Sequence, residues 1–357
     1  MIRKVQVFLL VCFLAGSFQN VFAQIDNIDE LLRAGVDDAN SLIQAYLEPF
    51  GKGFGADLNN GWYSSAKTHH FLGFDITVSG NAAVAPENAK TFSISDLGLQ
   101  NLVLSNPAAD PNTPTIVGDE TDGPDLNIIL ENPLTGQPEI IGTLTMPQGI
   151  GFRYVPSLMV QGSLGLFFNT DVIVRYFPEV KISNEVGRLQ MFGFGVKHNL
   201  TQWLPGGSLL PFDLAVMAGV TKFQATADLQ VLPDPNAIQT GATYENQRVD
   251  LEATSVTFNV LVSKKLSLLT LWGSVGIETS NVDLKLKGNY PVTLIEPVFG
   301  NRIIQDFQDP VNLSFDGPNT LHVNTGLKLE LIVLSVYAGY SFSNYPVVTA
   351  GVGFSIR

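Results

Sequence analysis

The chain has 357 residues, of which only 15% are charged, and its formal net charge is −13. A typical soluble domain has about 25% charged residues, so this content is low for a soluble protein. An acidic chain without a basic cluster excludes nucleic acid as the expected partner. The one cysteine lies in an N-terminal apolar run, so no disulfide framework is expected.

The N-terminus has the features of a secretory signal. Arg3 and Lys4 precede the apolar run 5–18, and Ala23 ends a small-residue cleavage motif. We therefore expect residues 1–23 to be removed, together with the only cysteine. An uncleaved anchor is the alternative, although a spanning helix needs about 20 apolar residues and this run is shorter.

Residues 24–63 contain the one convincing helical pattern, because apolar residues recur at three- and four-residue spacing. Asp37 or Asp38 is the expected N-cap, and Pro49 and Gly51 are the expected stop. Two interpretations remain open for this segment. It is either a plug that enters the lumen of a β-barrel from the periplasm, or an amphipathic periplasmic helix packed on the barrel's end.

A glycine-rich stretch, 51–63, follows the helical pattern. Its spacing matches neither the dinucleotide-binding fingerprint nor a P-loop. We expect a flexible glycine loop that runs near the barrel wall.

Strict alternation of apolar and polar residues predicts β-strands over most of the remaining chain. Residues Gly162-Ser163 are the expected turn between the second and third strands, and a change of apolar parity at 279–281 predicts a bulge. Pro156 does not suit a paired strand interior. The proline-rich segment 86–149 either adds a strand pair or forms one long surface segment. The expected strands are 71–84, 150–161, 164–177, 187–199, 210–224, 248–264, 268–287, 321–331, 334–342 and 348–356.

Small polar residues on one face of each strand suit a wet interior better than a packed core, which is typical of a transmembrane β-barrel. The predicted fold class is therefore all-β: an antiparallel transmembrane β-barrel of ten to fourteen strands with an N-terminal helical plug. Long and short connections alternate, as outer-membrane barrels require. The expected organisation is a signal peptide 1–23, a helical plug or periplasmic segment 24–63, and a barrel 64–357 with long external loops 85–149, 225–247 and 288–318.

Charge placement agrees with a barrel. Outward-facing charges lie only towards strand ends, and the run Arg248, Asp250 and Glu252 is tolerable only if it stands clear of the bilayer, since mid-membrane Lys or Arg costs about 2–4 kcal/mol. The inward charges either set the polarity of a pore or pair with one another to fill a narrow barrel. The residues predicted to line the lumen are Asp75, Arg153, Asp171, Arg175, Lys197, Asp213, Lys328 and Glu330.

No pattern indicates an enzyme, a cofactor or a metal site. His69 and His70 are adjacent, so they point to opposite faces of a strand and cannot chelate one metal together. Outer-membrane lipases need a His and a Ser two residues apart, and neither His198 nor His322 has such a serine. The acidic segment 119–125 lacks the ligand spacing of an EF-hand and is expected to be a solvated loop.

The mature chain resembles a family of uncharacterised, predicted outer-membrane proteins of Gram-negative bacteria. Two regions carry the resemblance: Asp38-Ala39-Asn40 through Gly61-Trp62-Tyr63, and Gly195-Val196-Lys197-His198-Asn199 with Gln202-Trp203-Leu204-Pro205-Gly206. More loosely, a helical segment before a barrel is similar to transporters of the long-chain fatty-acid uptake type. The resemblance implies location and architecture but no substrate.

We therefore expect an outer-membrane channel or uptake protein for a small solute, with hydrophobic solutes included. The expected partners are outer-membrane lipid, the barrel-insertion machinery and the solute itself. Two alternatives stay open: a barrel that does not transport and acts as a surface scaffold or adhesin, and a soluble periplasmic β-domain that binds a ligand.

Overall fold

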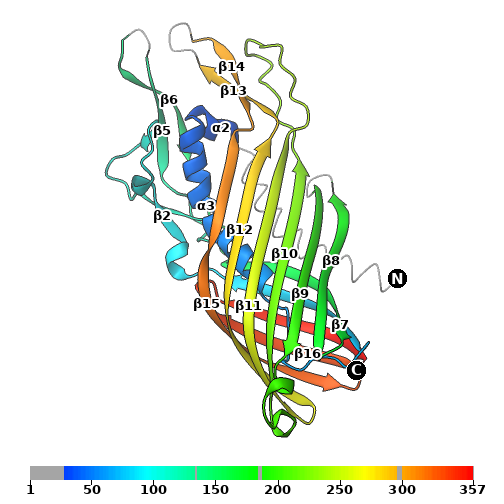
Figure 1. The fold of residues 1–357 in the computed structure, drawn as a ribbon. Helices are drawn as coiled ribbons and strands as arrows, with labels where there is room; N and C mark the ends of the chain where they lie inside the picture. The colour runs from blue at the N-terminus through cyan, green and yellow to red at the C-terminus, as the bar shows by residue number, and fades with distance from the viewer. Residues whose placement is uncertain (1–27, 133–134, 184–186, 296–299, 357) are drawn as a thin grey trace.

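The computed structural model describes residues 28–132, 135–183, 187–295 and 300–356. Within this part of the chain, ten antiparallel strands close into a barrel, with β1 completing the ring between β7 and β17 (Figure 1). The predicted fold class, a β-barrel with an N-terminal helical segment, is confirmed. The barrel strands are β1 (Phe74–Val84), β7 (Tyr154–Leu166), β8 (Thr170–Ser183), β9 (Gly187–Asn199), β10 (Asp213–Asp228), β11 (Arg248–Leu266), β12 (Leu269–Lys287), β15 (Val311–Leu331), β16 (Leu334–Phe342) and β17 (Val347–Ile356).

The two ends of the barrel differ in their connections. One end, called here the short-turn end, has tight turns at 167–169, 267–268 and 332–333, besides the loop 200–212. The opposite, long-loop end has the insert 85–153 and the hairpin of β13 (Asn289–Ile295) and β14 (Arg302–Gln308). The turn predicted at Gly162-Ser163 is wrong, because both residues lie within the β1–β7 ladder, and the chain reverses three residues later.

Pro156 lies inside β7, where the sequence disfavoured it. The ladder between β7 and β8 begins only at Gln161, so the adjoining part of β7 pairs with β1 alone. Ala85 donates to Arg153 whereas Val84 donates to Pro346, so alternate residues of β1 bond to β7 and to β17. By this alternation the nitrogen of Pro156 points away from β1, towards an edge of β7 that pairs with no strand of the described residues, and no ladder bond is lost there.

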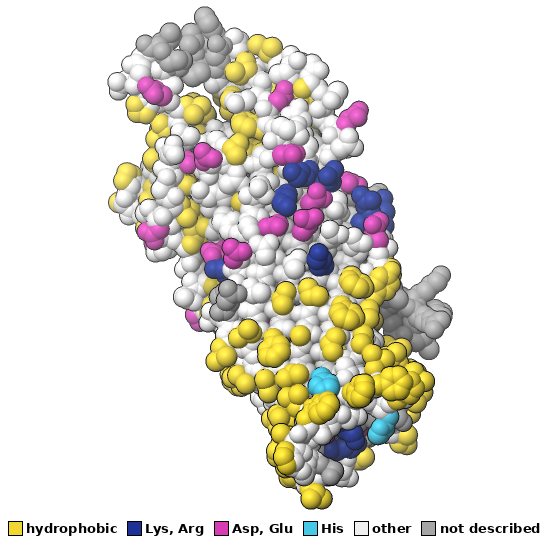
Figure 2. All heavy atoms as spheres, viewed as in Figure 1, with side chains coloured by type: hydrophobic (Ala, Val, Ile, Leu, Met, Phe, Trp, Pro, Cys, Tyr) yellow, Lys and Arg dark blue, Asp and Glu magenta, His cyan; other side chains and the backbone are white. Residues whose placement is uncertain are grey.

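The outward and inward faces of the tall strands exchange character halfway along. In β11, the outward Val256, Phe258 and Val260 are exposed near the short-turn end, while Val249 and Leu251 are buried on the inward face near the long-loop end. The inward face of β11 is therefore apolar near the long-loop end and polar nearer the short-turn end. Its outward face changes in the opposite sense. Figure 2 shows apolar side chains over the short-turn half and charged ones above them.

This exchange corrects the interpretation of β12. The even residues Val282, Leu284 and Leu286 face inward, as do the even residues before them, so the strand does not turn over. A register shift does occur in the β12–β15 ladder, between Glu278 and Ser280, but it does not exchange the faces of β12. The apolar residues of β12 change from odd to even positions because its apolar environment lies outside the wall in the short-turn half and inside the wall in the long-loop half.

The apolar surroundings inside the wall are the helix α3 (Val36–Asn59), which follows the short α2 (Ile28–Arg33). Phe50 and Phe54 belong to one buried cluster with Phe223, Val282 and Phe315 of the wall. Figure 1 shows α3 running along the inner side of the tall strands towards the short-turn end. The helix therefore enters the barrel from the long-loop end, the end at which the sequence predicts external loops.

The predicted helix stop and the predicted flexible glycine loop are both wrong, because α3 continues through Pro49 to Asn59. Its glycines lie where the helix backbone meets the wall: a Cβ on Gly51 would approach Phe315 to 2.4 Å and one on Gly53 would approach Val155 to 2.9 Å. Close packing here outweighs the low helix propensity of glycine. This geometry is a packing requirement and not a sign of flexibility.

The predicted aspartate N-cap is also wrong. Gly35 precedes the helix without a side-chain cap, and the Asp38 carboxylate accepts hydrogen bonds from the backbone N–H groups of Gln100 and Asn101 instead. Asn101 in turn donates to the Ala34 carbonyl at 2.8 Å. The helix start is thus fixed to the insert at the long-loop end.

The insert forms small sheets apart from the barrel. It has its own buried apolar cluster, which includes Ala34, between α2 and α3, and Leu42 of α3. A further hairpin lies between β12 and β15, so the predicted external loop 288–318 is shorter than expected. The non-barrel elements are η1 (Glu87–Ala89), β2 (Thr91–Ser93), η2 (Ile94–Leu97), β3 (Leu102–Leu104), β4 (Asn112–Pro114), β5 (Asp125–Glu131), β6 (Pro138–Thr145), β13 (Asn289–Ile295), β14 (Arg302–Gln308), η3 (Thr201–Trp203) and η4 (Gly207–Leu209).

Among the described residues, no helix combines the length and the apolar character that crossing a membrane with a helix would require.

Candidate functional site in the barrel lumen

The segment 60–73, called here the threaded segment, continues from α3 through the lumen to the start of β1. Its side chains contact the wall at successive levels: Trp62 and Tyr63 first, Ser65 next and His69 last. At these levels the outer surface of the wall is apolar, whereas the inner surface has polar side chains such as Ser263 and Asn259. Polar wall and threaded segment together form the candidate site.

Arg175 of β8 holds the junction between α3 and the threaded segment. Its guanidinium donates to the carbonyl oxygens of Leu58 at 2.8 Å and Asn60 at 2.6 Å. It also lies 3.6 Å from the ring centroid of Trp62. The last carbonyls of a helix have no intrahelical partner and carry the negative end of its dipole. A fully buried cation therefore caps the C-terminal end of α3 from the barrel wall.

Two paired glycines make room for Trp62. Gly195 and Gly219 are register partners on β9 and β10, and a Cβ on either would approach the indole to 2.9 or 2.8 Å. The slot lies on the inward face of both strands. Glycine in a strand interior often marks such a close approach.

Tyr63 occupies a polar network one level nearer the short-turn end. Its hydroxyl donates to the Asn259 side-chain oxygen at 2.9 Å, lies 2.6 Å from the Ser274 hydroxyl, and accepts from Asn324 at 2.8 Å. His322 contacts the same Asn259 oxygen at 2.7 Å. Three wall strands, β11, β12 and β15, are thus joined to the threaded segment through one phenol.

A charged cluster closes the lumen near the short-turn end. The Asp171 carboxylate accepts from the His69 backbone N–H at 2.9 Å and lies 3.1 Å from His69 Nδ1 and 3.0 Å from Lys197 Nζ. Asp75 lies 3.4 Å from His69 Nε2. Lys197 also donates to the Lys67 carbonyl at 2.9 Å. Because Asp171 is fully buried, these pairs are shielded from solvent.

The structure brings most of the predicted lumen residues into the barrel. Asp171, Arg175 and Lys197 lie together against the threaded segment, with Asp75 beside His69. Lys328 lies 3.4 Å from Glu330, which also pairs with Lys265, at the short-turn end. Asp213 is half-buried at the same end and forms no ion pair with any described residue.

The placement of Arg153 in the lumen is wrong. The strand β7 begins one residue later, at Tyr154, so Arg153 lies in the connection beyond the barrel wall. Its partly exposed guanidinium pairs with Glu87 of the insert.

Trp62 and Tyr63 were not predicted as anchors, and His69 was not predicted as the centre of an ion-pair cluster. One signal was available, because inward-facing glycines in β9 and β10 indicate a bulky lumen occupant. Several polar atoms of this interface are buried without a hydrogen-bond partner in the described chain. They include the Trp62 and Trp272 indole nitrogens and the hydroxyls of Ser255 and Ser341.

No group of three or more His, Asp or Glu side chains gathers as metal ligands within the residues that the structure covers. His69 is buried and His70 exposed, so the adjacent histidines do point apart. What the arrangement can do is hold a polypeptide segment in a polar lumen through hydrogen bonds and ion pairs.

We expect Arg175→Met to destabilise the folded protein by about 2 kcal/mol, because two buried carbonyl groups lose a charged donor. Urea unfolding followed by tryptophan fluorescence measures this change. Arg153→Met is the matched control, since its partly exposed ion pair contributes about 1 kcal/mol or less. Equal effects of the two substitutions would contradict the capping role of Arg175.

A family model described as "Family of unknown function (DUF6588)" matches residues 2–356. No curated protein matches the sequence. Solved structures with some similarity include Ail, the attachment invasion locus protein of Yersinia pestis, at 10% identity, covering 80% of this chain and 100% of that chain, with a TM-score of 0.25.

Two further solved structures have similarly low scores. The translocator domain of the autotransporter NalP from Neisseria meningitidis has 10% identity, covers 81% of this chain and 90% of its own, and has a TM-score of 0.23. A Pseudomonas aeruginosa FadL homologue has 9% identity, coverage of 80% and 89%, and a TM-score of 0.20. Similarities this weak carry no argument about function.

Proposed function

The chain belongs to the family of unknown function DUF6588, and we propose that it is a plugged barrel of the Gram-negative outer membrane that admits a small solute when its threaded segment leaves the lumen wall. In this proposal the long-loop end faces outward, as outer-membrane barrels have short periplasmic turns and longer outer loops. The N-terminal secretion signal in the sequence agrees with export.

An apolar band on the short-turn half supports a membrane location. Large apolar side chains face outward there on neighbouring strands, among them Val260 at 37%, Ile277 at 60% and Val336 at 51% exposure. A contiguous exposed apolar surface of this extent is unfavourable in water. The nine-residue β16 lies within this band, and a membrane-spanning strand needs about 9–11 residues.

One observation carries the proposal of passage: the two parts of the plug are held differently. The helix α3 is part of an apolar core in the long-loop half. The threaded segment, at the level of the apolar band, contacts its wall through hydrogen bonds and ion pairs and through a smaller buried apolar cluster that joins Trp62 to Met217 and Leu261. Water can replace the polar contacts at modest net cost, whereas releasing the larger apolar core around α3 exposes more apolar surface.

The chemistry of the wall also bears on the solute. Inward side chains at this level include many hydroxyls, amides and charges, such as Ser274, Asn324 and Lys197, beside one small apolar cluster. A hydrophobic solute would have to displace water from these groups without pairing them, which is unfavourable. The proposed solute is therefore small and polar, and the hydrophobic solutes that the sequence left open are disfavoured.

A disulfide lock tests the proposal. The hydroxyl oxygens of Ser65 in the threaded segment and Ser263 in β11 are 3.3 Å apart, so cysteines at both positions are within reach of a disulfide. We expect the oxidised Ser65→Cys/Ser263→Cys protein to be closed in planar bilayers and in liposome-swelling assays with small sugars. Reduction should restore the openings of the wild type. The disulfide would hold the threaded segment in the lumen, so no continuous path for ions or sugars would remain.

Ser65→Cys alone is the control, because it changes the threaded segment without attaching it to the wall. Oxidised double-cysteine protein that conducts like the wild type would overturn the proposal. A wild type that neither conducts nor swells liposomes would do the same and would favour the surface-scaffold alternative, for which the folded insert at the long-loop end is the relevant feature.

A further inference from the structure

The outer surface of the barrel changes abruptly from apolar to charged across neighbouring residue rows. Residues that are register partners on adjacent strands form rows across β9, β10 and β11. The row of Phe194, Val220 and Val256 is apolar. The next row towards the long-loop end consists of Phe192, Lys222 and Thr254. Beyond it lie the row of Gln190, Gln224 and Glu252 and the row of Arg188, Thr226 and Asp250. The boundary of the apolar band therefore lies at Lys222, and polar rows continue directly above it.

A concavity lies in this polar part of the outer wall. It has a volume of about 390 Å³ and is lined by side chains of β8, β9, β10 and β11. Its polar lining includes two arginines and two glutamines, together with four acidic residues: Arg188, Arg248, Gln190, Gln224, Glu179, Asp228, Asp250 and Glu252. Ligand sites commonly have volumes of about 300–1,000 Å³. The concavity opens on the outside of the barrel, so it is separate from the lumen site.

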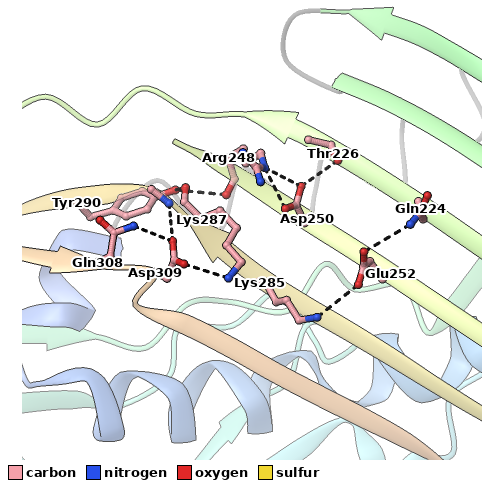
Figure 3. Close-up of polar contacts among 11 residues, drawn as sticks. Gln224, Thr226, Arg248, Asp250, Glu252, Lys285, Lys287, Tyr290, Gln308 and Asp309 are labelled. Atoms are coloured by element: carbon pink, nitrogen blue, oxygen red, sulfur yellow. Dashed lines mark hydrogen bonds and ion pairs between the residues drawn. The ribbon is translucent and has the colours of Figure 1, made fainter. Parts of the chain in front are cut away.

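Hydrogen bonds hold the polar side chains of this wall in an ordered array (Figure 3). Asp250 accepts from Arg248 Nε at 3.0 Å and from the Thr226 hydroxyl at 2.9 Å. Glu252 accepts from Lys285 at 3.4 Å and from Gln224 at 3.5 Å. The acidic groups thus position the basic ones and offset part of their charge.

Basic residues are concentrated here although the whole chain is acidic. Arg188 and Arg248 have side-chain exposures of 52% and 43%. Arg248 uses only Nε in its hydrogen bonds to described residues, and the nearest acidic partner of Arg188, Glu179, is 3.9 Å away. Among the 20 Lys and Arg residues of the sequence, those on this wall are Lys181, Arg188, Lys222, Arg248, Lys285 and Lys287.

We propose that this concavity binds the phosphorylated sugar headgroup of an outer-leaflet glycolipid. Guanidinium groups suit phosphate oxygens because they present two parallel donors. The amide and carboxylate groups of Gln190, Gln224 and Glu252 suit sugar hydroxyls. The apolar rows beginning at Phe194 lie beside the same site, where the acyl chains of such a lipid would pack.

The proposal rests on the outer-membrane location given under the proposed function, but not on solute passage. The adjoining apolar rows and the amide side chains favour this ligand over other anions. A free phosphate would use the arginines but not the adjoining apolar band, and a glycerophospholipid would leave the amide row without sugar hydroxyls.

Binding to the full-length protein in detergent micelles tests the proposal. The probe is purified rough lipopolysaccharide, compared with the same lipid after enzymatic dephosphorylation and with phosphatidylglycerol. We expect the double variant Arg188→Gln/Arg248→Gln to bind the intact glycolipid at least tenfold more weakly than the wild type. The dephosphorylated lipid and phosphatidylglycerol should bind the wild type weakly.

A matched control removes the same charge elsewhere: Lys90→Gln/Arg153→Gln, two basic residues that both contact Glu87 of the insert, should bind like the wild type. Unheated gel mobility shows that each variant is folded. Equal binding by the two double variants would overturn the proposal, as would wild-type binding that is insensitive to dephosphorylation or equal for phosphatidylglycerol. Because the assay needs no conductance, a wild type that binds glycolipid but never conducts would refute only the proposed passage.

Discussion

Asp171→Asn is expected to release the threaded segment and to raise the frequency of openings in planar bilayers at least tenfold. The substitution keeps the shape of the side chain but removes the charge that lies 3.0 Å from Lys197 Nζ and 3.1 Å from His69 Nδ1. Removing one partner of a buried ion pair costs about 3–5 kcal/mol, because the other charge stays buried without compensation. The lysine ammonium is only 8% exposed, so water cannot compensate it in place.

Two further variants make this expectation specific. Adding Lys197→Met to Asp171→Asn removes the uncompensated charge, so the double variant should regain part of the lost stability in urea unfolding. Asp213→Asn removes a carboxylate at the same end that forms no ion pair with described residues, and it should leave the openings unchanged. Openings that increase equally in Asp213→Asn would show that the effect is one of general lumen charge.

Gly51→Val is expected to destabilise the long-loop half of the protein by about 3 kcal/mol, the upper part of the usual range for overpacking. A Cβ at this position would lie 2.4 Å from the Phe315 ring, whose side chain is 2% exposed and has no space to move into. The helix would have to shift away from β15. Limited proteolysis of the insert and of α3 should therefore become faster, while the short-turn half stays protected.

Gly80→Ala is the control for this effect. It lies in β1, where the nearest atom to an added Cβ is the Ser157 carbonyl oxygen at 4.0 Å. Comparable destabilisation by the two substitutions would mean that the close approach of helix and wall at Gly51 contributes nothing particular.

Most of the barrel was predictable because alternation is a local property of the sequence. The expected strand 187–199 agrees with β9 at both ends, and 248–264 agrees with β11 to within two residues. Errors arose where a residue's surroundings are not those its neighbours suggest. The even residues of β12 from Val282 onward are apolar because α3 lies against them, and no local pattern shows on which side of a strand a distant helix packs.

The candidate site was predictable only in part for a similar reason. Asp171 and Arg175 could be placed inward from strand parity, and the structure has them inward. Their partners could not be identified, because Arg175 donates to a carbonyl 117 positions away in the sequence. Arg153 was misplaced by the strand boundary, which lies one residue beyond it. The alternation of residues along a strand shows which face of the sheet a side chain is on. Which residues then lie close to it depends on how the strands are arranged in the closed barrel.

The threading of the N-terminal segment also constrains how the molecule is made. The strand that follows this segment, β1, is the one that completes the ring by pairing with the last strand, β17. If the ring closed first, the whole of α3 would have to unfold and pass lengthwise through a narrow polar opening. That barrier is avoided if the N-terminal segment packs against the wall before β1 pairs with β17. The pairing of β1 with β17, the first and last strands of the barrel in chain order, is then the final step of biogenesis, so shortening β17 should trap an unclosed precursor with its plug already in place.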